Sequence, residues 1–393
     1  MTDSHAYFAA DVASPGSDEA KRRLAELAGG VLHVITGLHT GGAETQLATL
    51  AIANHRAGHR VAVVSLIAGG AHCERLSAAG VPVMDLGLER GHWSLFAVTK
   101  LARIIRVLRP TAVQSWMYHA DLLSVLAWLC AARWRTSPLY WGVRCSDLDI
   151  ARYGAPLARV VRLCAWLSRL PRAVVANAEA GRRVHRDLGY RARAFPVIDN
   201  GIDIDRYRPD EATRAEIREA YGIESSASLV AVVARVDPMK DYLTFIQALD
   251  RLPGVYAFAV GERTESLPEV DRLVRLGRRD DVQRLLTACD LMVSSSAFGE
   301  GFSNAIAEGM ACGLPAVATD VGDNRRLVGD CGRIVAPRDP IALADAIRDV
   351  LADDPRGLGD LARRRIVENF SVARMVDAFN RLHRGELLVT DTI

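Results

Sequence analysis

The chain has 393 residues, of which 50% are apolar and 24% are charged, enough for two globular domains with sizeable cores. Lysine and arginine (49) nearly balance aspartate and glutamate (47), which argues against a dedicated nucleic-acid-binding protein. The seven scattered cysteines include no Cys-x-x-Cys pair and predict reduced core thiols. No apolar run suffices for a transmembrane helix, and residues 1–28 lack an apolar signal region. We therefore expect a cytoplasmic protein with a flexible tail over residues 1–28.

Short apolar runs alternate with segments of helical period along the first half of the chain. This alternation is typical of a parallel sheet with crossover helices, and it predicts one α/β domain over residues 29–198. The expected strands cover residues 32–36, 61–66, 112–116, 139–143 and 173–176, and the expected helices include 43–57 and 100–108.

The pattern pauses at Asn200-Gly201, a strong turn signal, and then restarts. Further strands are expected at residues 229–236, 255–260, 291–294 and 316–319, which gives a second α/β domain over residues 199–371. Residues 372–393 are expected to form a C-terminal helix that packs back toward the first domain. Two such domains predict a binding site in the cleft where the carboxyl ends of the sheets face each other.

The densest group of signals is the heptapeptide at residues 298–304, Phe-Gly-Glu-Gly-Phe-Ser-Asn, which follows the strand at 291–294. Gly299 and Gly301 permit a tight loop, and either Ser303 or Asn304 is a suitable helix N-cap. A helix that starts here would direct free backbone N–H groups into the cleft. Such a helix start binds a phosphate or a sugar oxygen readily.

Two carboxylates accompany this loop. Glu300 lies on the loop itself, and Glu308 lies four residues past Asn304, one turn into the helix on the same face. Two glutamates at this spacing are ordinarily part of a solvated helix face, but the glycine loop and the cap favour a binding role. The two side chains could accept hydrogen bonds from two sets of hydroxyls, as a sugar nucleotide offers on its donor sugar and its ribose.

Two cations follow the predicted strand at residues 229–236. Arg235 and Lys240 lie five residues apart across a short loop, at the sheet end where α/β proteins bind ligands. A diphosphate leaving group needs such cations, because negative charge grows on it as the glycosidic bond breaks. The alternative is a pair of ordinary surface side chains, and the intervening Asp237-Pro238-Met239 is an unusual loop.

Two weaker signals come from the first domain. Gly41 and Gly42 join its first strand to its first helix and permit a close approach of backbone to phosphate, but they complete neither a Gly-x-Gly-x-x-Gly nor a Walker motif. His119 follows the strand at 112–116. A structural and a functional role for this histidine remain equally open.

Together these residues resemble family 4 retaining glycosyltransferases of the GT-B fold, in which two Rossmann-like domains face each other across a cleft. The resemblance spans residues 31 to about 383 and places the motifs in the family's order. The first half also resembles members that assemble exopolysaccharides and O-antigens. The matching segments are Glu300-x7-Glu308, Arg235 with Lys240, Gly41-Gly42-Ala43-Glu44, Asn200-Gly201-Ile202-Asp203 and residues 276–282.

The resemblance implies transfer of a sugar, with retention of configuration, from a nucleoside-diphosphate sugar to a glycan, a lipid-linked or a small-molecule acceptor. Uracil is the base that the family favours, which makes the expected donor a UDP-sugar. No protein nucleophile is implied, and the leaving phosphate would help to deprotonate the acceptor. Catalytic roles fall to Glu300, His119, Arg235 and Lys240. The implied nucleotide and sugar contacts are Gly41, Gly42, Arg278, Asp281, Val282, Gly301, Phe302, Ser303, Asn304 and Glu308, together with the Arg235–Lys240 pair.

We expect no cofactor beyond the sugar-nucleotide co-substrate, and no metal. Asp147-Leu148-Asp149 and Asp203-Ile204-Asp205 look like metal-binding Asp-x-Asp motifs, but two aspartates at this spacing are common in turns. The basic, apolar stretch from Arg152 to Arg172 is either a helix with a solvated arginine face or a peripheral contact with the inner face of the membrane.

Two other functions remain open: a GT-B sugar-nucleotide epimerase and an inactive partner in polysaccharide assembly. A dinucleotide dehydrogenase is disfavoured, because its glycine fingerprint is missing.

Overall fold

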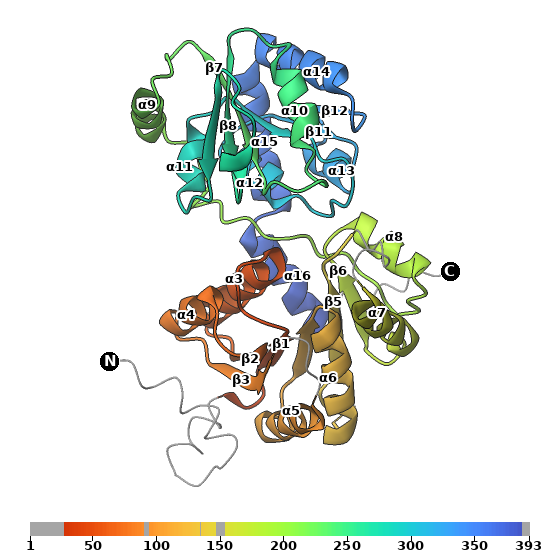
Figure 1. Ribbon diagram of the computed structural model, residues 1–393. Coiled ribbons are helices and arrows are strands. Elements are labelled where there is room, and N and C mark those ends of the chain that lie inside the picture. The colour runs from red at the N-terminus through yellow and green to blue at the C-terminus, as the bar shows by residue number, and fades with distance from the viewer. Residues whose placement is uncertain (1–26, 90–93, 134, 147–153, 387–393) are drawn as a thin grey trace.

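The structure, a computed structural model, describes residues 27–89, 94–133, 135–146 and 154–386. Residues 1–26 of the predicted tail and residues 152–153 of the 152–172 stretch therefore lie outside the described residues. The described chain forms two α/β domains stacked one above the other, with helix α16 reaching from the junction into the first domain (Figure 1).

Six parallel strands form the sheet of the first domain, in the order β3-β2-β1-β4-β5-β6. The central strands are mostly apolar and almost wholly buried, because helices cover both faces of the sheet. One core lies between the sheet and α5, α6 and α7, and a second between the sheet and α3, α4 and α16. The elements are β1 (Val31–Ile35), α3 (Gly42–Arg56), β2 (Val61–Ile67), α4 (Ala71–Ala78), β3 (Val83–Leu88), α5 (Leu95–Leu108), β4 (Ala112–Trp116), α6 (Tyr118–Ala131), β5 (Leu139–Val143), α7 (Ala155–Leu167), β6 (Ala173–Ala176) and α8 (Glu179–Asp187).

The second domain repeats the design with six parallel strands in the order β12-β11-β10-β7-β8-β9. Apolar cores again fill both sides of the sheet. The elements are α9 (Glu211–Ala220), β7 (Ser228–Val233), α10 (Tyr242–Leu249), β8 (Val255–Val260), the 3-10 turn η1 (Thr264–Ser266), β9 (Leu273–Gly277), α11 (Val282–Thr287), β10 (Leu291–Ser294), α12 (Asn304–Ala311), β11 (Ala316–Thr319), α13 (Asn324–Val328), β12 (Gly332–Val335), α14 (Pro340–Ala352) and α15 (Pro355–Asn369). A last helix, α16 (Val372–Arg384), follows this domain in the chain.

The fold agrees with the expected pair of Rossmann-like domains, with three differences in detail. Strands β3, β9 and β12 were not predicted from the sequence. Strand β7 ends at Val233 rather than at residue 236, because residues 234–236 already belong to the loop that carries Arg235. Helix α5 begins at Leu95 rather than at residue 100, because the Ser94 hydroxyl caps it by accepting from the backbone N–H of Phe96.

The chain crosses between the domains twice, and the two crossings are hydrogen-bonded to each other. The backbone N–H of Ile202 donates to the carbonyl of Phe370 (2.8 Å), and that of Val372 donates to the carbonyl of Ile202 (3.0 Å). A Cβ on Gly201 would lie 2.8 Å from the Cα of Val372, so only glycine permits this approach. The sequence signal at Asn200-Gly201 therefore marks the junction of the domains.

Helix α16 belongs to the first domain by its contacts. Met375, Phe379 and Leu382 are buried in the core that α3 and α4 cover, and Asn380 donates to the side chain of Asn54 (3.0 Å). None of the helices within the described residues is both long and apolar enough to cross a membrane.

Candidate active site

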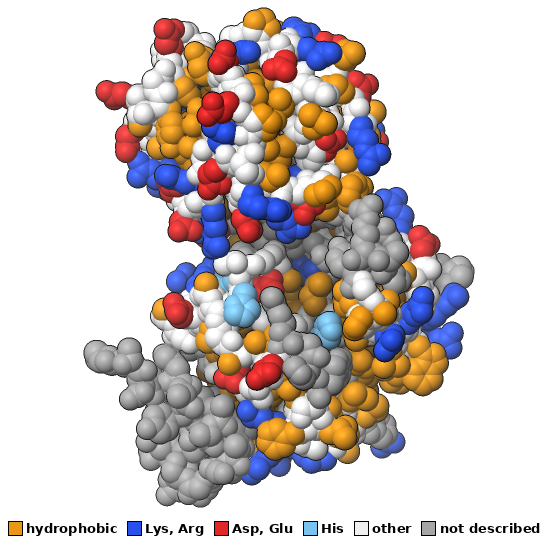
Figure 2. All heavy atoms as spheres, in the orientation of Figure 1, with side chains coloured by type: hydrophobic (Ala, Val, Ile, Leu, Met, Phe, Trp, Pro, Cys, Tyr) orange, Lys and Arg blue, Asp and Glu red, His pale blue; other side chains and the backbone are white. Residues whose placement is uncertain are grey.

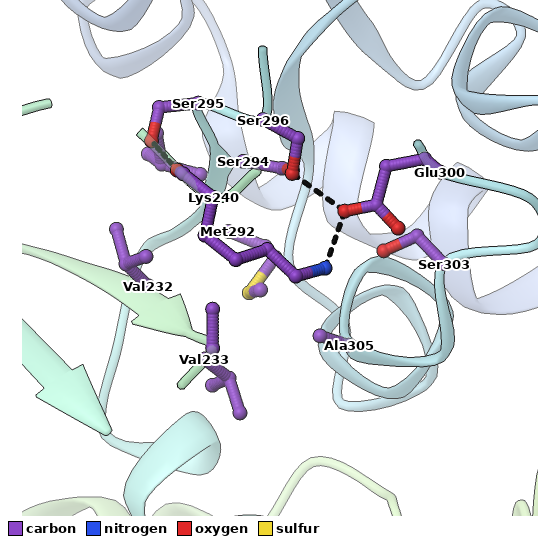
Figure 3. A pocket seen from close by; sticks show the side chains of 12 residues that line it. Val232, Val233, Lys240, Met292, Ser294, Ser295, Ser296, Glu300, Ser303 and Ala305 are labelled. Atoms are coloured by element: carbon purple, nitrogen blue, oxygen red, sulfur yellow. Dashed lines mark hydrogen bonds and ion pairs between the residues drawn. The ribbon is translucent and has the colours of Figure 1, made fainter. Parts of the chain in front are cut away.

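Glu300 and Lys240 meet in a small pocket of the second domain. Glu300 lies on the loop after β10, is only 7% exposed, and accepts at Oε1 from the Nζ of Lys240 and from the hydroxyl of Ser296 (2.5 Å). Lys240 lies on the loop after β7, so its side chain reaches across from the neighbouring strand (Figure 3). The pocket is lined by Val232, Val233, Ala234, Lys240, Met292, Val293, Ser294, Ser295, Ser296, Glu300, Ser303 and Ala305.

Backbone contacts hold these two loops in place. The hydroxyl of Ser295 donates to the carbonyl of Lys240 (2.9 Å), and the N–H of Ala297 donates to the carbonyl of Met239 (2.8 Å). Gly322, with φ +62°, packs against Glu300 so closely that a Cβ would lie 2.2 Å from the Glu300 carbonyl oxygen. The position of the Glu300 carboxylate therefore depends on a glycine in a different loop.

Arg235, the second predicted cation, pairs with Asp237 rather than with Glu300. Arg235 has a 58% exposed side chain, and its Nε donates to the carboxylate of Asp237 (3.3 Å). The N–H of Met239 also donates to Asp237, and this bond, with the charge of Arg235, lowers the pKa of the Asp237 carboxyl. The structure thus brings Lys240 to Glu300 and leaves Arg235 at the rim, tied to the loop that was noted as unusual.

Two helix starts meet across the interface between the domains. Helix α12 begins at Asn304 with Ser303 in the N-cap position, and helix α3 begins at Gly42 after Gly41; neither cap residue makes a side-chain hydrogen bond to its helix. A Cβ on Gly42 would lie 3.8 Å from the Nδ2 of Asn304, which places the helices start to start. Uncapped backbone N–H groups and the positive ends of two helix dipoles therefore converge, a suitable environment for an anion.

The remaining loop residues explain how the α12 start is presented. The ring of Phe302 is buried against Phe370 (centroids 5.5 Å apart) and anchors the loop in the core of the second domain. A Cβ on Gly301 would lie 2.4 Å from the hydroxyl oxygen of Ser146, so the first domain packs directly on this part of the loop.

Glu308 lies one turn into α12, paired with a residue of the interdomain segment. The hydroxyl of Tyr207 hydrogen-bonds to the Glu308 carboxylate. Burial raises the pKa of Glu308 to about 7, although the Tyr207 bond and the charge of Arg206 oppose the shift. Burial and the Glu308 charge in turn raise the pKa of Tyr207. Glu308 is thus a carboxylate that changes protonation state near neutral pH.

The segment expected to flank the nucleotide base lies next to this pair. Arg206 donates to the carbonyl of Asp280 (3.2 Å), which connects the Tyr207–Glu308 pair to the turn between β9 and α11. Within the turn, Arg278 is exposed, Asp281 forms a two-bond ion pair with Arg279 (2.8 Å each), and Val282 begins α11. That ion pair lowers the pKa of the Asp281 carboxyl.

His119 is the second residue of α6, at the carboxyl edge of the first sheet. It follows Met117, which has φ +74°, and is half-buried. Burial lowers its pKa, so the imidazole is neutral at pH 7. His119 belongs to the first domain, whereas Glu300 and Lys240 belong to the second, and its catalytic role stays a prediction.

Arg144 and Asn200 were given no role from the sequence, although Asn200 lies in a segment that carries the family resemblance. The Nη1 of Arg144 donates to the Asn200 side chain (2.8 Å), whose Nδ2 donates to the Asn304 side chain (2.8 Å). The guanidinium lies over the Trp116 ring, 4.3 Å from its centroid, and burial lowers the pKa of Arg144 to about 9. This chain of polar groups runs from the end of β5 to the start of α12.

A second interdomain contact had no sequence signal at all. Asp323 of the second domain accepts from the N–H groups of Glu179 and Ala180 (2.9 Å each), and so caps helix α8 of the first domain. Arg326 pairs with Asp323 (3.0 Å) and with Asp199 before the first crossing. The two domains are therefore joined by a shared helix cap.

Of the two Asp-x-Asp motifs, the one at residues 203–205 lies within the described residues. Asp203 accepts from the N–H groups of Asp205 (3.2 Å) and Arg206 (3.0 Å), an ordinary turn-forming arrangement. Asp147 and Asp149 lie outside the described residues. Within residues 27–89, 94–133, 135–146 and 154–386, no group of three or more histidine, cysteine, aspartate or glutamate side chains could hold a metal ion.

Known proteins match both domains. Residues 40–206 match the family described as "Glycosyltransferase Family 4", and residues 227–353 match that described as "Glycosyl transferases group 1". The D-inositol 3-phosphate glycosyltransferase of Mycolicibacterium smegmatis is 28% identical over 284 residues, 66% of this chain and 64% of that relative. The enzyme of the same name from Xylanimonas cellulosilytica is 28% identical over 293 residues, 66% and 70% of the two chains.

Solved structures share the fold. HepE of Anabaena, described in complex with UDP and glucose, superposes with a TM-score of 0.75 at 23% identity over 90% of this chain and 98% of that one. Sucrose-phosphate synthase from Thermosynechococcus elongatus gives 0.72 at 19% identity over 91% and 98%. One family match covers the first domain and the other covers the second, in the same order as the motifs along the sequence. The chain belongs to the family 4 glycosyltransferases.

Proposed function

We propose that the protein transfers a sugar from a nucleoside-diphosphate sugar, in particular a UDP-sugar, to a hydroxyl group of its acceptor, with retention of anomeric configuration. The observation that carries this proposal is the meeting of the α3 and α12 starts at Gly42 and Asn304 beside the buried Lys240–Glu300 pair. The backbone N–H groups of two uncapped helix starts would bind a diphosphate, and a sugar attached to it would reach the carboxylate. HepE, which shares the fold, is described with UDP and glucose.

The groups of the pocket divide the work on the donor. The backbone N–H groups at Gly42 and at residues 301–304 would hold the diphosphate, and Lys240 would stabilise the negative charge that grows as the glycosidic bond breaks. Arg235 would approach from the rim. Both recorded bonds of the Glu300 carboxylate end on Oε1, so Oε2 is placed to accept from the hydroxyls of the donor sugar.

The nucleoside would lie along α12. Glu308 would accept from the ribose hydroxyls, and the turn formed by Arg278, Asp281 and Val282 would flank the base. No protein side chain need act as nucleophile, since the leaving phosphate can take the acceptor proton on the same face of the sugar. His119 would orient the donor from the first domain. No metal is required in this scheme, because Lys240 and Arg235 supply the positive charge.

The acceptor would bind mainly to the first domain, as a glycan, a lipid-linked sugar or a small hydroxylated molecule. The curated relatives are named for D-inositol 3-phosphate, which makes a small phosphorylated polyol a member of the test panel. A lipid-linked acceptor would also suit a peripheral membrane contact through the Arg152–Arg172 stretch. In the described part of that stretch, Arg159, Arg162 and Trp166 of α7 are all exposed.

The first experiment is a thermal-stability screen with UDP-, GDP-, ADP- and TDP-sugars in the presence of EDTA. A shift with one base family supports donor binding without a metal and identifies the base. Failure of every sugar nucleotide to shift the midpoint or to bind by calorimetry would contradict the proposal. Nucleotide release that requires an acceptor distinguishes a transferase from an epimerase, and binding without turnover on any acceptor would indicate an inactive partner.

A further inference from the structure

Basic charge is concentrated in one part of the first domain. The whole chain has a net charge of only +2, but residues 90–178 contain 13 lysines and arginines against three aspartates. One of the three, Asp121, is fully buried and accepts a hydrogen bond from Ser115 (2.5 Å). Helices α5, α6 and α7 all fall within this segment and cover the same face of the first sheet. Among the basic residues of the segment, Arg144 is the exception, because it binds Asn200 at the domain junction. The exposed basic residues in the described part of the segment are Arg103, Arg106, Arg109, Arg135, Arg159, Arg162, Arg169 and Arg172, which make that face positive.

Large apolar side chains are exposed on the same face. Trp166 of α7 is 77% exposed, and Leu163 and Leu170 beside it are each 41% exposed. On α6, Leu126 and Leu129 are also exposed. Figure 2 shows hydrophobic and basic side chains side by side over this part of the first domain. Apolar groups on a positive surface are the composition of interfacial membrane-binding helices.

A hollow between the ends of α6 and α7 joins the two kinds of side chain. Its floor is apolar, from Trp128, Leu129 and Leu170, and Arg135, Arg172 and Arg193 surround it, all three exposed. Two hydrogen bonds hold the walls of the hollow in place. The indole N–H of Trp128 donates to the carbonyl of Ser137 (2.6 Å), and the backbone N–H of Arg172 donates to the carbonyl of Leu139 (2.7 Å).

The hollow lies away from the donor site. Leu139 begins β5 and Arg172 immediately precedes β6, so these residues lie at the amino ends of the parallel strands. The proposed donor contacts lie at the carboxyl ends. A ligand in the hollow would therefore leave the donor site open.

We propose that this hollow binds the phosphate headgroup of an anionic phospholipid, while Trp166, Leu163 and Leu170 enter the interfacial region of the bilayer. The proposal gives a specific site to the membrane contact suggested above, and it does not depend on the transferase activity. Three arginines around an apolar floor match a phosphodiester attached to a lipid. Free phosphate would leave the exposed Trp166 unexplained, and a second copy of the chain would bring two positive faces together.

Vesicle flotation of the full chain tests this directly, without any sugar nucleotide. Vesicles with roughly one third phosphatidylglycerol in phosphatidylcholine should bind the protein, and pure phosphatidylcholine vesicles should not. Reversing two charges (Arg172→Glu with Arg193→Glu) should reduce the partition coefficient by about tenfold or more. Trp166→Ala should reduce it without changing its dependence on salt, whereas the charge reversal should make that dependence shallower.

Matched variants elsewhere control for charge and hydrophobicity. Arg356→Glu with Arg364→Glu, exposed on α15 of the second domain, changes the net charge equally, and Leu243→Ala removes a side chain that is 65% exposed on α10. Both controls should bind the anionic vesicles like the parent. Circular dichroism and the thermal midpoint confirm that each variant is folded.

Three results would overturn the proposal: equal binding to both vesicle types, unchanged binding of the two first-domain variants, or loss of vesicle binding in the controls as well. Self-association that Trp166→Ala abolishes, with no vesicle binding, would assign the face to a second copy instead. Saturation of the hollow by inorganic phosphate with no vesicle binding would likewise refute a lipid site. A sugar-nucleotide screen on the same preparation tests the transferase proposal separately.

Discussion

The Lys240 ammonium and the Glu300 carboxylate form an ion pair across two loops that are 60 residues apart in the chain. Their side chains are only 20% and 8% exposed, so each neutralises the other in a mostly buried place. Each side chain therefore fixes the orientation of the other before any ligand enters the pocket.

Removing either member should abolish most turnover while the protein stays folded. Lys240→Ala and Glu300→Ala should each lower kcat by about 100- to 1000-fold, because each removes a charge fixed at the proposed reacting centre. The double variant Lys240→Met with Glu300→Gln should lose little more than either single change, since the two groups act as a unit. Steady-state kinetics with a verified donor measure this, and near-normal kcat in both single variants would refute the site assignment.

Glu308 should make donor binding depend on pH near neutrality. Its pKa is raised to about 7 by burial, so the carboxylate that is proposed to accept from the ribose forms only as the pH rises through that value. The affinity for the sugar nucleotide should therefore increase by up to about tenfold between pH 6 and 8, and Glu308→Gln should remove the slope. A sugar nucleotide is the right probe, because its diphosphate does not titrate in this range. Calorimetric titration at several pH values gives the slope.

The same shift predicts the pH dependence of stability. A carboxyl with a raised pKa binds its proton more tightly in the folded state, so its contribution to stability is present below about pH 4.5 and is lost as the pH rises through about 7. In Glu308→Gln this part of the decline should be missing. The hydrogen bond from the Tyr207 hydroxyl favours the ionised Glu308 carboxylate. Tyr207→Phe removes this bond and should therefore move the midpoint of the stability decline to higher pH. A Tyr207→Phe profile that matches the parent would contradict the pairing.

Gly322→Ala should damage catalysis through Glu300. The new methyl would lie 2.2 Å from the Glu300 carbonyl oxygen, so the loop must move, and kcat should fall by at least tenfold. Gly254→Ala is the matched control: Gly254 also has positive φ (+83°), but nothing lies within 4 Å of the added carbon. Both variants should lose about 1 kcal/mol of stability from the positive φ, and Gly322→Ala should lose more because of the clash. Equal kcat in the two would show that the contact has no catalytic consequence.

Asp323→Ala should loosen the association of the domains. It removes the cap that the second domain places on α8, at a cost of about 0.5–2 kcal/mol. Asp339→Ala removes the same kind of cap from α14, where Asp339 accepts from Ile341 and Ala342 within one domain. Urea unfolding should show a similar loss in both, but small-angle scattering should show a larger radius of gyration only for Asp323→Ala. Equal radii would mean that the cap does not hold the domains together.

The sequence predicted the central strands and missed three strands at the sheet edges. Strands β3, β9 and β12 each form an edge, and each includes a charged residue: Asp85, Arg275 and Arg333. An edge strand is less enclosed than a central one, so its sequence need not be continuously apolar. β6 is also an edge strand, but it is short and wholly apolar and was predicted correctly.

In the candidate active site, the sequence predicted the local motifs and missed the contacts between distant segments. Motifs that act through backbone geometry, such as the glycine loop before Asn304, leave a local pattern that a single sequence reveals. The pairing of Tyr207 with Glu308 and the cap from Asp323 depend on which distant segments the fold brings together, and no local spacing encodes them. The sequence also did not predict the partner of Arg235. Asp237 lies in the loop between the two cations and forms an ion pair with Arg235, so that only Lys240 pairs with Glu300.

The return of α16 into the first domain reverses the order in which the domains can be completed during synthesis. Met375, Phe379 and Leu382 fill the core beside α3, so that core stays incomplete until α16 has left the ribosome. The second domain, which ends before residue 372, has all of its own strands earlier. The domain that is translated first is therefore the one that finishes folding last, and it keeps an open apolar groove for the length of α16 until then.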